Sequence, residues 1–245
     1  MNLVVFDIDG TLVRSVELDD TCFVRAFADV LGIEGISTDW SRYRHSTDSG
    51  LAREIVRRHL GRDPLPEEID SVRERCCQLL RKARLRHPGA IRPVEGAAAL
   101  LAHLDGQTPW RAAIASGSWP ETARIKLEAA GLAVEKLPGA FADTALDRCE
   151  ILRQAVARAA QRYARAGFSK VVYVGDGPWD VETARRLRIA FVGIAGRQGA
   201  EPLVSAGAAT VLSSFEPLAS VVAALEDARV PQEDRFAPAS FSPGG

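Results

Sequence analysis

Two aspartates separated by one residue follow an apolar run at the start of the chain. The segment from Leu3 to Thr11 reads Leu-Val-Val-Phe-Asp-Ile-Asp-Gly-Thr. Two carboxylates this close repel each other unless a cation or a shared proton relieves the repulsion. A divalent cation beside a carboxylate nucleophile suits phosphoryl transfer. Asp7 and Asp9 are therefore candidate catalytic residues, although an Asp-rich turn after a strand has the same pattern.

The elements around this segment must hold the two carboxylates in place. The apolar run is rich in residues that favour strands, so residues 3–8 are predicted to form a buried parallel strand. Asp7 then falls near the end of the strand, and Gly10 provides the turn. The catalytic candidates are thus expected at one edge of a sheet.

Polar residues also follow other predicted strands. The carboxyl ends of parallel strands gather functional groups at one sheet edge. Taken singly, each has an ordinary structural explanation, such as ending a strand or capping a helix. The groups are Ser116 and Gly117 after a strand at 111–115, Asp176 and Asp180 after a strand at 171–174, and Asp143 and Arg148 after a weaker strand near 140.

The chain divides into three zones. Residues 14–90 show three apolar stripes at helical spacing and are predicted to form a small helical bundle. Gly32 and Gly61 are expected to end the first two helices, and the third begins after Pro64 and Pro66.

From residue 91 helices and strands alternate, which predicts a parallel sheet covered on both faces. The fold class is therefore α/β, a Rossmann-like parallel sheet with helices on both faces, plus a small all-helical domain. Ser118 to Glu121 has the form of a capping box for a helix that ends at Gly131. The other expected elements are helices at 94–104, 147–166 and 216–226, and strands at 137–142, 190–194 and 209–212.

Composition is typical of a globular enzyme. The 245 residues are 47% hydrophobic and 26% charged, with a net charge of −1, so no nucleic-acid partner is suggested. No apolar run is long enough to span a membrane. The four cysteines form no CxxC motif, which fits reduced thiols, and the chain shows no signal peptide. A cytoplasmic location is expected, and the Pro-, Ser- and Gly-rich residues 229–245 are expected to be a disordered tail.

These motifs together resemble the haloacid dehalogenase superfamily of phosphohydrolases. The segment from Asp7 to Thr11 matches the first motif of the family, Ser116 the second, and Gly175 to Asp180 the fourth. The resemblance covers residues 1 to about 225 and implies a core domain of residues 1–13 and 91–228. It also implies that residues 14–90 are a helical cap of the C1 type.

The resemblance implies roles for the matched residues. Asp7 would be the nucleophile that forms an aspartyl-phosphate, and Asp9 the general acid and then the general base. Mg²⁺ would be bound by the carboxylates of Asp7 and Asp176 and the backbone carbonyl of Asp9, with Asp180 orienting these ligands or contributing through water. The residues expected to hold the phosphate are Gly10, Thr11, Ser116, Gly117 and Arg148.

The third motif departs from the family pattern. The family usually has a lysine there, and none of the four lysines falls at the expected strand end. Lys170 begins a strand, and Lys126 lies inside the helix after Ser116. Arg148 is the best substitute, because an arginine stays charged and can bind phosphate through two hydrogen bonds. Lys126 remains the alternative.

The implied activity is hydrolysis of a small phosphate monoester. Dehalogenases of the superfamily lack an acid at the position of Asp9, and phosphonate hydrolases use a cap lysine, so both relatives are disfavoured. A phosphosugar mutase keeps both aspartates and stays open as an alternative, as does a non-catalytic phospho-acceptor switch.

The polar stretch before the second helix, with Thr47 and Asp48, is expected to reach over the site or to cap that helix. Weaker candidates for substrate contact are Arg42, Arg44, His45, Trp119 and Trp179.

Overall fold

A six-stranded parallel sheet forms the centre of the protein. The computed structural model describes residues 1–106, 108–196 and 198–232. The strand order is β5-β4-β1-β6-β7-β8, so the first strand lies in the middle and the chain turns to opposite sides from it. The strands are β1 (Asn2–Phe6), β4 (Trp110–Ala115), β5 (Gly139–Ala140), β6 (Val171–Gly175), β7 (Ala190–Ile194) and β8 (Val211–Leu212).

The central strand is buried on both faces, as its unbroken apolar sequence predicts. Val5 pairs with Ala113 of β4 and with Tyr173 of β6. The strand ends at Phe6 and not at residue 8, yet the Asp7 amide still donates to the carbonyl of Val174. The last hydrogen bond of β1 therefore fixes the backbone from which the Asp7 side chain departs.

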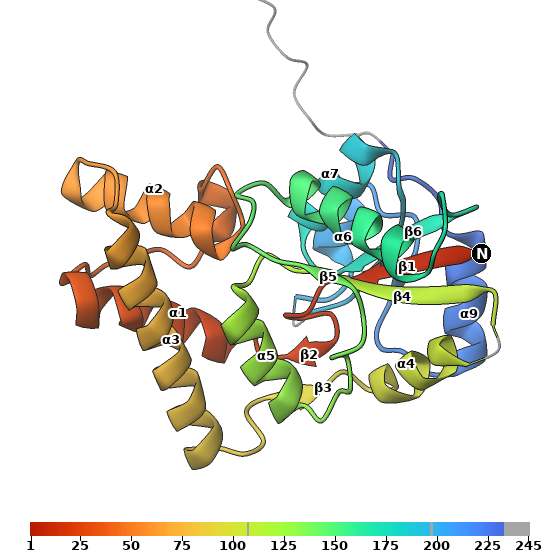
Figure 1. Ribbon diagram of the computed structural model, residues 1–245, viewed down its shortest axis with the longest axis horizontal. Helices are drawn as coiled ribbons and strands as arrows, with labels where there is room; N and C mark the ends of the chain where they lie inside the picture. Colours follow the sequence, from red (N-terminus) through yellow and green to blue (C-terminus); the bar gives the residue numbers. More distant parts are fainter. Residues whose placement is uncertain (107, 197, 233–245) are drawn as a thin grey trace, which may run out of the picture.

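Helices cover both faces of this sheet, which confirms the predicted fold class (Figure 1). Alternate residues of each strand face two separate apolar clusters, one with α6 and α7 and the other with α4 and α9. The helices of this part are α4 (Ala97–Asp105), α5 (Pro120–Ala129), α6 (Arg148–Arg162), α7 (Pro178–Leu187), α8 (Glu201–Ser205) and α9 (Leu218–Asp227).

The segment between the first strand and the rest of the sheet is mainly helical. Its helices lie together beside the sheet in Figure 1, and their apolar residues join the cluster that contains α6 and α7. Helices α1 and α3 pack against each other, and α3 also packs against α5. The elements are α1 (Val16–Leu31), the short 3₁₀ helix η1 (Trp40–Arg42), α2 (Asp48–Leu60) and α3 (Pro66–Arg86).

A two-stranded ribbon connects this helical segment to the sheet. Strand β2 (Val13–Arg14) pairs antiparallel with β3 (Arg92–Pro93), so the chain leaves and returns side by side. Neither strand can be predicted from the sequence, because two residues are too few to show an alternating pattern.

Three other local predictions need correction. Ser118 does not cap α5, because Trp119 is the N-cap residue and the Ser118 hydroxyl donates to Asp9. Helix α8 was not predicted, since a helix of this length has only one turn of periodicity. The ends of α1, α2 and α5 at Gly32, Gly61 and just before Gly131 agree with the prediction. The tail predicted at 229–245 begins too early, because Phe191 of β7 donates to the carbonyl of Arg229 and the Gln232 amide donates to Gly207. The rest of the predicted tail, residues 233–245, lies outside the described residues.

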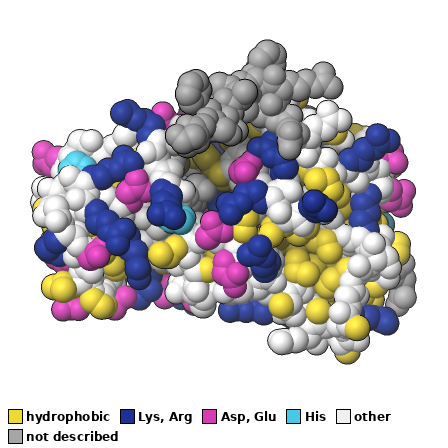
Figure 2. Space-filling model, turned by 90° about the horizontal axis from the view of Figure 1, so that it is seen from above, with side chains coloured by type: hydrophobic (Ala, Val, Ile, Leu, Met, Phe, Trp, Pro, Cys, Tyr) yellow, Lys and Arg dark blue, Asp and Glu magenta, His cyan; other side chains and the backbone are white. Residues whose placement is uncertain are grey.

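Many surface arginines lie beside carboxylates. On the face shown in Figure 2, Lys and Arg side chains are interspersed with Asp and Glu, and hydrophobic side chains gather over the sheet part on the right. Arg25 and Arg75, from α1 and α3, both bind Asp29. The four cysteines are free and buried. Within the described ranges, the helices are too short or too polar to cross a membrane.

Candidate active site

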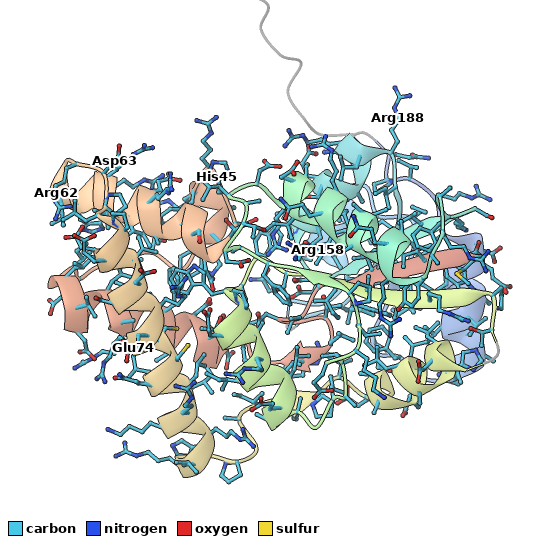
Figure 3. The ribbon with its side chains drawn as sticks, viewed as in Figure 1. His45, Arg62, Asp63, Glu74, Arg158 and Arg188 are labelled. Atoms are coloured by element: carbon cyan, nitrogen blue, oxygen red, sulfur yellow. The ribbon has the colours of Figure 1, made fainter. Side chains whose placement is uncertain are left out.

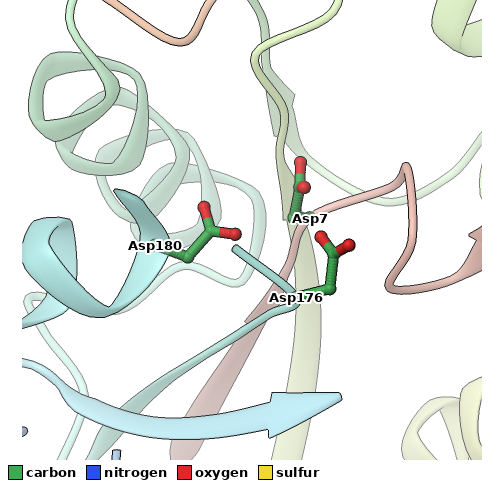
Figure 4. A group of neighbouring side chains, drawn as sticks. All are labelled: Asp7, Asp176 and Asp180. Carbon is green, nitrogen blue, oxygen red and sulfur yellow. The ribbon is translucent and has the colours of Figure 1, made fainter. Parts of the chain in front are cut away.

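Three aspartates converge at the carboxyl ends of the two central strands. Asp7 follows β1, Asp176 follows β6, and Asp180 lies in the first turn of α7 (Figure 4). One carboxylate oxygen from each lies within 4.8 Å of the others. Asp7 is only 2% exposed. The structure therefore brings together three of the acidic residues that the strand-end pattern singled out.

The turn after Asp7 runs directly beneath Asp176. Gly10 has a φ of 76°, and a Cβ at this position would lie 1.8 Å from Oδ2 of Asp176. Only glycine allows both this backbone conformation and this close approach. Thr11 is fully buried, and its hydroxyl lies 3.5 Å from Oδ1 of Asp176. Gly10 and Thr11 thus fix the position of Asp176 relative to Asp7.

Arg148 supplies the positive charge beside this group. Its Nη1 donates to Oδ1 of Asp180 at 2.8 Å and lies 3.6 Å from Oδ1 of Asp7. Its Nε donates to the carbonyl and the hydroxyl of Ser46, on the loop before α2. Burial disfavours the charged form of Arg148, but Asp180 and Asp7 outweigh this effect and raise its pKa. Arg148 is therefore a permanent cation that links the acidic group to the helical segment.

Asp180 is fully engaged with other protein groups. Its Oδ1 accepts from Arg148 and, at 2.7 Å, from the hydroxyl of Tyr173. Its Oδ2 accepts from the backbone amide of Gly177 at 3.0 Å. A carboxylate with this many donors is suited to orienting its neighbours, because its oxygens are already in use.

The carboxylate of Asp9 belongs to a different set of contacts. Its Oδ2 accepts from Lys126 at 2.6 Å and from Ser118 at 2.8 Å, and its Oδ1 accepts from Ser15 at 2.5 Å. Burial raises the pKa of Asp9, but Lys126 and these hydrogen bonds outweigh it and bring the pKa below its ordinary value. Lys126 also pairs with Asp19 of α1 at 3.0 Å.

The group around Asp7 carries excess negative charge. Burial raises the pKa of Asp7 to about 7 and outweighs the attraction of Arg148. Burial, together with the carboxylate of Asp180, raises the pKa of Asp176 well above its ordinary value. Three carboxylates share one arginine here, so a further cation or protons must balance them.

These residues fit a hard divalent cation. Oδ1 of Asp7 is buried and accepts no hydrogen bond from any residue that the structure describes. A buried carboxylate oxygen without a donor is costly unless something else binds it. The donor set consists of carboxylate oxygens, which Mg²⁺ and Ca²⁺ prefer. Asp7 and Asp176 are the two carboxylates with oxygens available to hold such an ion.

Ser116 and Gly117 lie at the end of β4, facing the same edge. The Ser116 amide donates to Ala140 and continues the sheet, while its hydroxyl accepts from the amide of Ser118. A Cβ on Gly117 would lie 2.8 Å from Nη2 of Arg148 and from the carbonyl of Ser46. Glycine is therefore needed where the arginine crosses this loop.

The start of α2 is bound to the loops of the sheet. Thr47 is the N-cap, and its hydroxyl also donates to the carbonyl of Leu146 at 2.8 Å. The Asp48 amide donates to Gly117, and Oδ2 of Asp48 accepts from the amide of Trp119. Thr47 and Asp48 thus cap the helix and also close over the loop after β4. The expected helix cap is confirmed, whereas a contact of this stretch with substrate stays a prediction.

The weaker candidates lie in different surroundings. Trp119 is fully buried, and its indole N–H donates to Ser49, so it packs between the two parts of the molecule. The Trp179 ring lies 5.8 Å from the Arg148 guanidinium. Among the others, Arg42, Arg44 and Asp143 are exposed, and His45 lies beside the beginning of α2, well away from the exposed tip at Arg62 and Asp63 (Figure 3).

Several contact residues escaped the sequence analysis. Tyr173 lies within an apolar strand, and its position two residues before the strand end is the only signal that it reaches Asp180. Ser15 and Asp19 belong to none of the sequence motifs, so no sequence pattern singles them out. Lys126 had been considered only for the phosphate, and the structure pairs it with Asp9 and Asp19.

Comparison with known proteins agrees with this fold and these motifs. No curated protein matches the chain significantly. The chain is similar in structure to a hydrolase from Pseudomonas syringae (TM-score 0.70, 23% identity, 91% of this chain and 98% of that chain covered). It is also similar to CbbY from Rhodobacter sphaeroides in complex with phosphate (TM-score 0.65, 21% identity, 88% and 95% covered).

A putative beta-phosphoglucomutase from Bacteroides vulgatus has a similar structure as well (TM-score 0.65, 15% identity, 92% and 89% covered). At these identities the likeness shows the fold alone. The model of the haloacid dehalogenase-like hydrolases matches residues 1–188. The protein therefore belongs to the haloacid dehalogenase-like hydrolase family.

Proposed function

We propose that the protein is a Mg²⁺-dependent phosphatase that hydrolyses a small-molecule phosphate monoester through an aspartyl-phosphate on Asp7. The observation that carries this proposal is the state of Asp7. It is a buried carboxylate at the end of the central strand, with one oxygen that accepts no hydrogen bond from the described residues. A carboxylate in these surroundings has an oxygen free to attack phosphorus.

In the first step the Asp7 carboxylate attacks the phosphorus atom of the ester. A bond forms between an Asp7 oxygen and phosphorus, and the bond between phosphorus and the ester oxygen breaks. The negative charge of the bound ester would raise the pKa of Asp9, which lies below its ordinary value without substrate, so that Asp9 carries a proton at this stage and donates it to the departing alkoxide. Arg148, with Nη1 3.6 Å from Asp7, is placed to balance negative charge on the transferring group.

In the second step water attacks the phosphorus atom of the aspartyl-phosphate. The bond between phosphorus and Asp7 breaks, inorganic phosphate leaves, and Asp9 accepts the proton that the water loses. The hydroxyl of Ser116 and the loop at Gly117 lie at the same sheet edge and are proposed to hold the phosphate oxygens, with Gly10 and Thr11 on the other side.

The bound cation would neutralise charge and polarise the phosphoryl oxygens. Asp7, Asp176 and the backbone carbonyl of Asp9 would hold it, and the convergence of the Asp7 and Asp176 carboxylate oxygens supports this assignment. Asp180 would act through its neighbours, since three protein donors already occupy its oxygens.

Residues 14–90 are proposed to act as the cap over the site, and residues 1–13 with 91–228 as the core. The contacts of Thr47 and Asp48 with the sheet loops support a closed entrance. Such an entrance favours small esters, because a closing lid must exclude water during transfer. A cytoplasmic location is part of the same proposal, and the four unpaired buried cysteines support it.

The test is phosphate release from a panel of small monoesters, with Mg²⁺ or with EDTA. Asp7→Asn is the inactive variant, and Asp105→Asn, an exposed aspartate at the end of α4, is the matched control. We expect Mg²⁺-dependent release that Asp7→Asn abolishes and Asp105→Asn retains.

Release by Asp7→Asn at the full rate, with the intact asparagine verified by mass, would contradict the proposal. A phosphoenzyme that persists and turns over only with a sugar bisphosphate would point to a mutase instead. Labelling of Asp7 by a phosphodonor without any turnover would point to a switch.

A further inference from the structure

Lys126 occupies an unusual position for a lysine. It lies on α5, and its side chain is 0% exposed. Lysine is almost never fully buried unless it is paired. Its Nζ lies 2.6 Å from Oδ2 of Asp9 and 3.0 Å from Oδ2 of Asp19, and it donates to the Ser118 hydroxyl at 2.9 Å. An ammonium has three N–H donors, so these three acceptors use all of them.

These contacts join two parts of the chain. Lys126 and Ser118 belong to the sheet part, where α5 follows β4, while Asp19 lies in the first turn of α1. Helix α3 packs against both α1 and α5. The ammonium therefore lies at the junction between the helical segment and the sheet, in contact with a carboxylate from each.

Lys126 also determines where the Asp9 carboxylate points. Asp9 Oδ2 has two donors, Lys126 and Ser118, and the Ser118 hydroxyl is itself bound by Lys126. Without the ammonium, Oδ2 of Asp9 accepts a hydrogen bond from Ser118 alone. The Ser118 hydroxyl is then no longer oriented by Lys126. Within the described residues Lys126 forms no ion pair with Asp7, whose cation is Arg148.

We propose that Lys126 is a positioning residue that holds the Asp9 carboxylate in place for proton transfer and, through Asp19, makes that position depend on the docking of α1. The inference rests on the proposed function, in which Asp9 carries the proton. It assigns Lys126 a task other than binding phosphate, which is left to Arg148.

The test uses two esters that differ in their need for a proton. An alkyl phosphate releases a basic alkoxide and needs an acid, whereas p-nitrophenyl phosphate releases a stable anion and does not. Lys126→Met removes the ammonium and keeps an apolar side chain of similar length. We expect kcat/KM for the alkyl ester to fall about 100-fold and that for the aryl ester to change less than about threefold. A role in folding alone would lower both equally.

Two variants calibrate the result. Asp9→Asn is expected to show the same selective loss, and Lys82→Met, an exposed lysine on α3, neither loss. Equal loss on both esters in Asp9→Asn would overturn the acid role and with it the proposed function. Selective loss in Asp9→Asn with equal or no loss in Lys126→Met would overturn this inference and leave the proposed function standing.

The link to α1 is tested with Asp19→Asn. We expect kcat/KM of this variant to fall about tenfold for the alkyl ester and to change little for the aryl ester. In the Lys126→Met background it should cause little further selective loss, because the hydrogen-bonded link from Asp19 to Asp9 through the ammonium is then gone. An equal effect in both backgrounds would overturn the link. If Lys126→Met alone does not fold by circular dichroism, the double variant removes the unpaired Asp19 charge and provides the same alkyl-to-aryl comparison.

Discussion

Asp7 and Asp9 are two residues apart in sequence but lie in opposite surroundings. Oδ1 of Asp7 accepts no hydrogen bond from the described residues, and burial raises the pKa of Asp7 to about 7. Both oxygens of Asp9 accept hydrogen bonds, and its pKa lies below the ordinary value because Lys126 and its other donors outweigh burial. The surroundings of Asp7 therefore leave an oxygen available to a ligand, whereas protein donors already bind both oxygens of Asp9.

The largest effect is expected on the Asp7 side. Asp7→Asn removes the proposed nucleophile, so turnover should fall by on the order of 10⁴-fold or more, and no phosphoenzyme should form. Asp9→Asn should still form a phosphoenzyme with an aryl ester. Acid-quench labelling followed by mass spectrometry separates the two variants. Labelling of the Asp7→Asn protein at another residue would remove the basis of the comparison.

The next effect concerns the two buried cations. Arg148→Met should lower kcat/KM by about 10²- to 10³-fold and weaken inhibition by inorganic phosphate, because it removes the charge beside Asp7. Arg148→Lys should recover part of the loss. Inhibition constants for phosphate measure this directly. If Lys126→Met weakens phosphate inhibition more than Arg148→Met does, the assignment of the two cations is reversed.

The stability of the folded protein should respond to pH in opposite ways at Asp7 and at Asp9, and to metal at Asp7. The pKa of Asp7 is about 7 in the folded protein against an ordinary value of 3.8, because burial raises it. Between about pH 4 and pH 7 the folded state then holds more protons at Asp7 than the unfolded state, so without metal the stability contributed by Asp7 falls as pH rises. Asp9 has the opposite sign and contributes stability that is lost only as pH falls below its ordinary pKa.

Saturating Mg²⁺ should therefore raise the Tm by about 5 °C at pH 8 and by less at pH 5.5, where protons compete for Asp7 and Asp176. Thermal unfolding with Mg²⁺ or EDTA at both pH values measures this. Asp176→Asn is the matched control and should lose most of the response. An equal rise at both pH values would show that Mg²⁺ binds elsewhere.

The smallest effect is expected where α2 meets the sheet loops. Thr47→Val keeps the shape of the side chain but removes the cap of α2 and the hydrogen bond to Leu146. The free energy of unfolding should fall by about 1–2 kcal/mol. Urea unfolding measures this loss, with Ser71→Ala on the exposed side of α3 as control. A loss no larger than that of the control would show that this junction contributes little.

Local patterns predicted the sheet well. Strand β7 has the bounds that its apolar run indicated, and the strand-end rule brought Asp7, Asp176 and Arg148 together from segments far apart in sequence. These predictions succeeded because buried strands and their ends depend mainly on short runs of residues.

The Asp9 side could not be predicted in the same way. Ser118 appeared to be a helix cap, but its hydroxyl is engaged by Asp9, 109 residues away, and by Lys126. Lys126 lies on α5, and which face of this helix turns inward depends on how α3 packs against it and α1 against α3. A sequence motif records the residues that a family shares, whereas these contacts depend on tertiary packing.

The pairing of β2 with β3 has a consequence for how such a protein changes over evolution. Val13 pairs with Pro93 and Arg14 with Arg92, so the helical segment between them leaves the sheet part and returns to it at the same place. A segment joined in this way can be lengthened, shortened or exchanged for another without altering the order of the sheet strands, since the closure of its ends costs little more for a longer loop. Under the proposed function, substrate choice and reaction chemistry could then be inherited separately, the first with the exchanged segment and the second with the sheet.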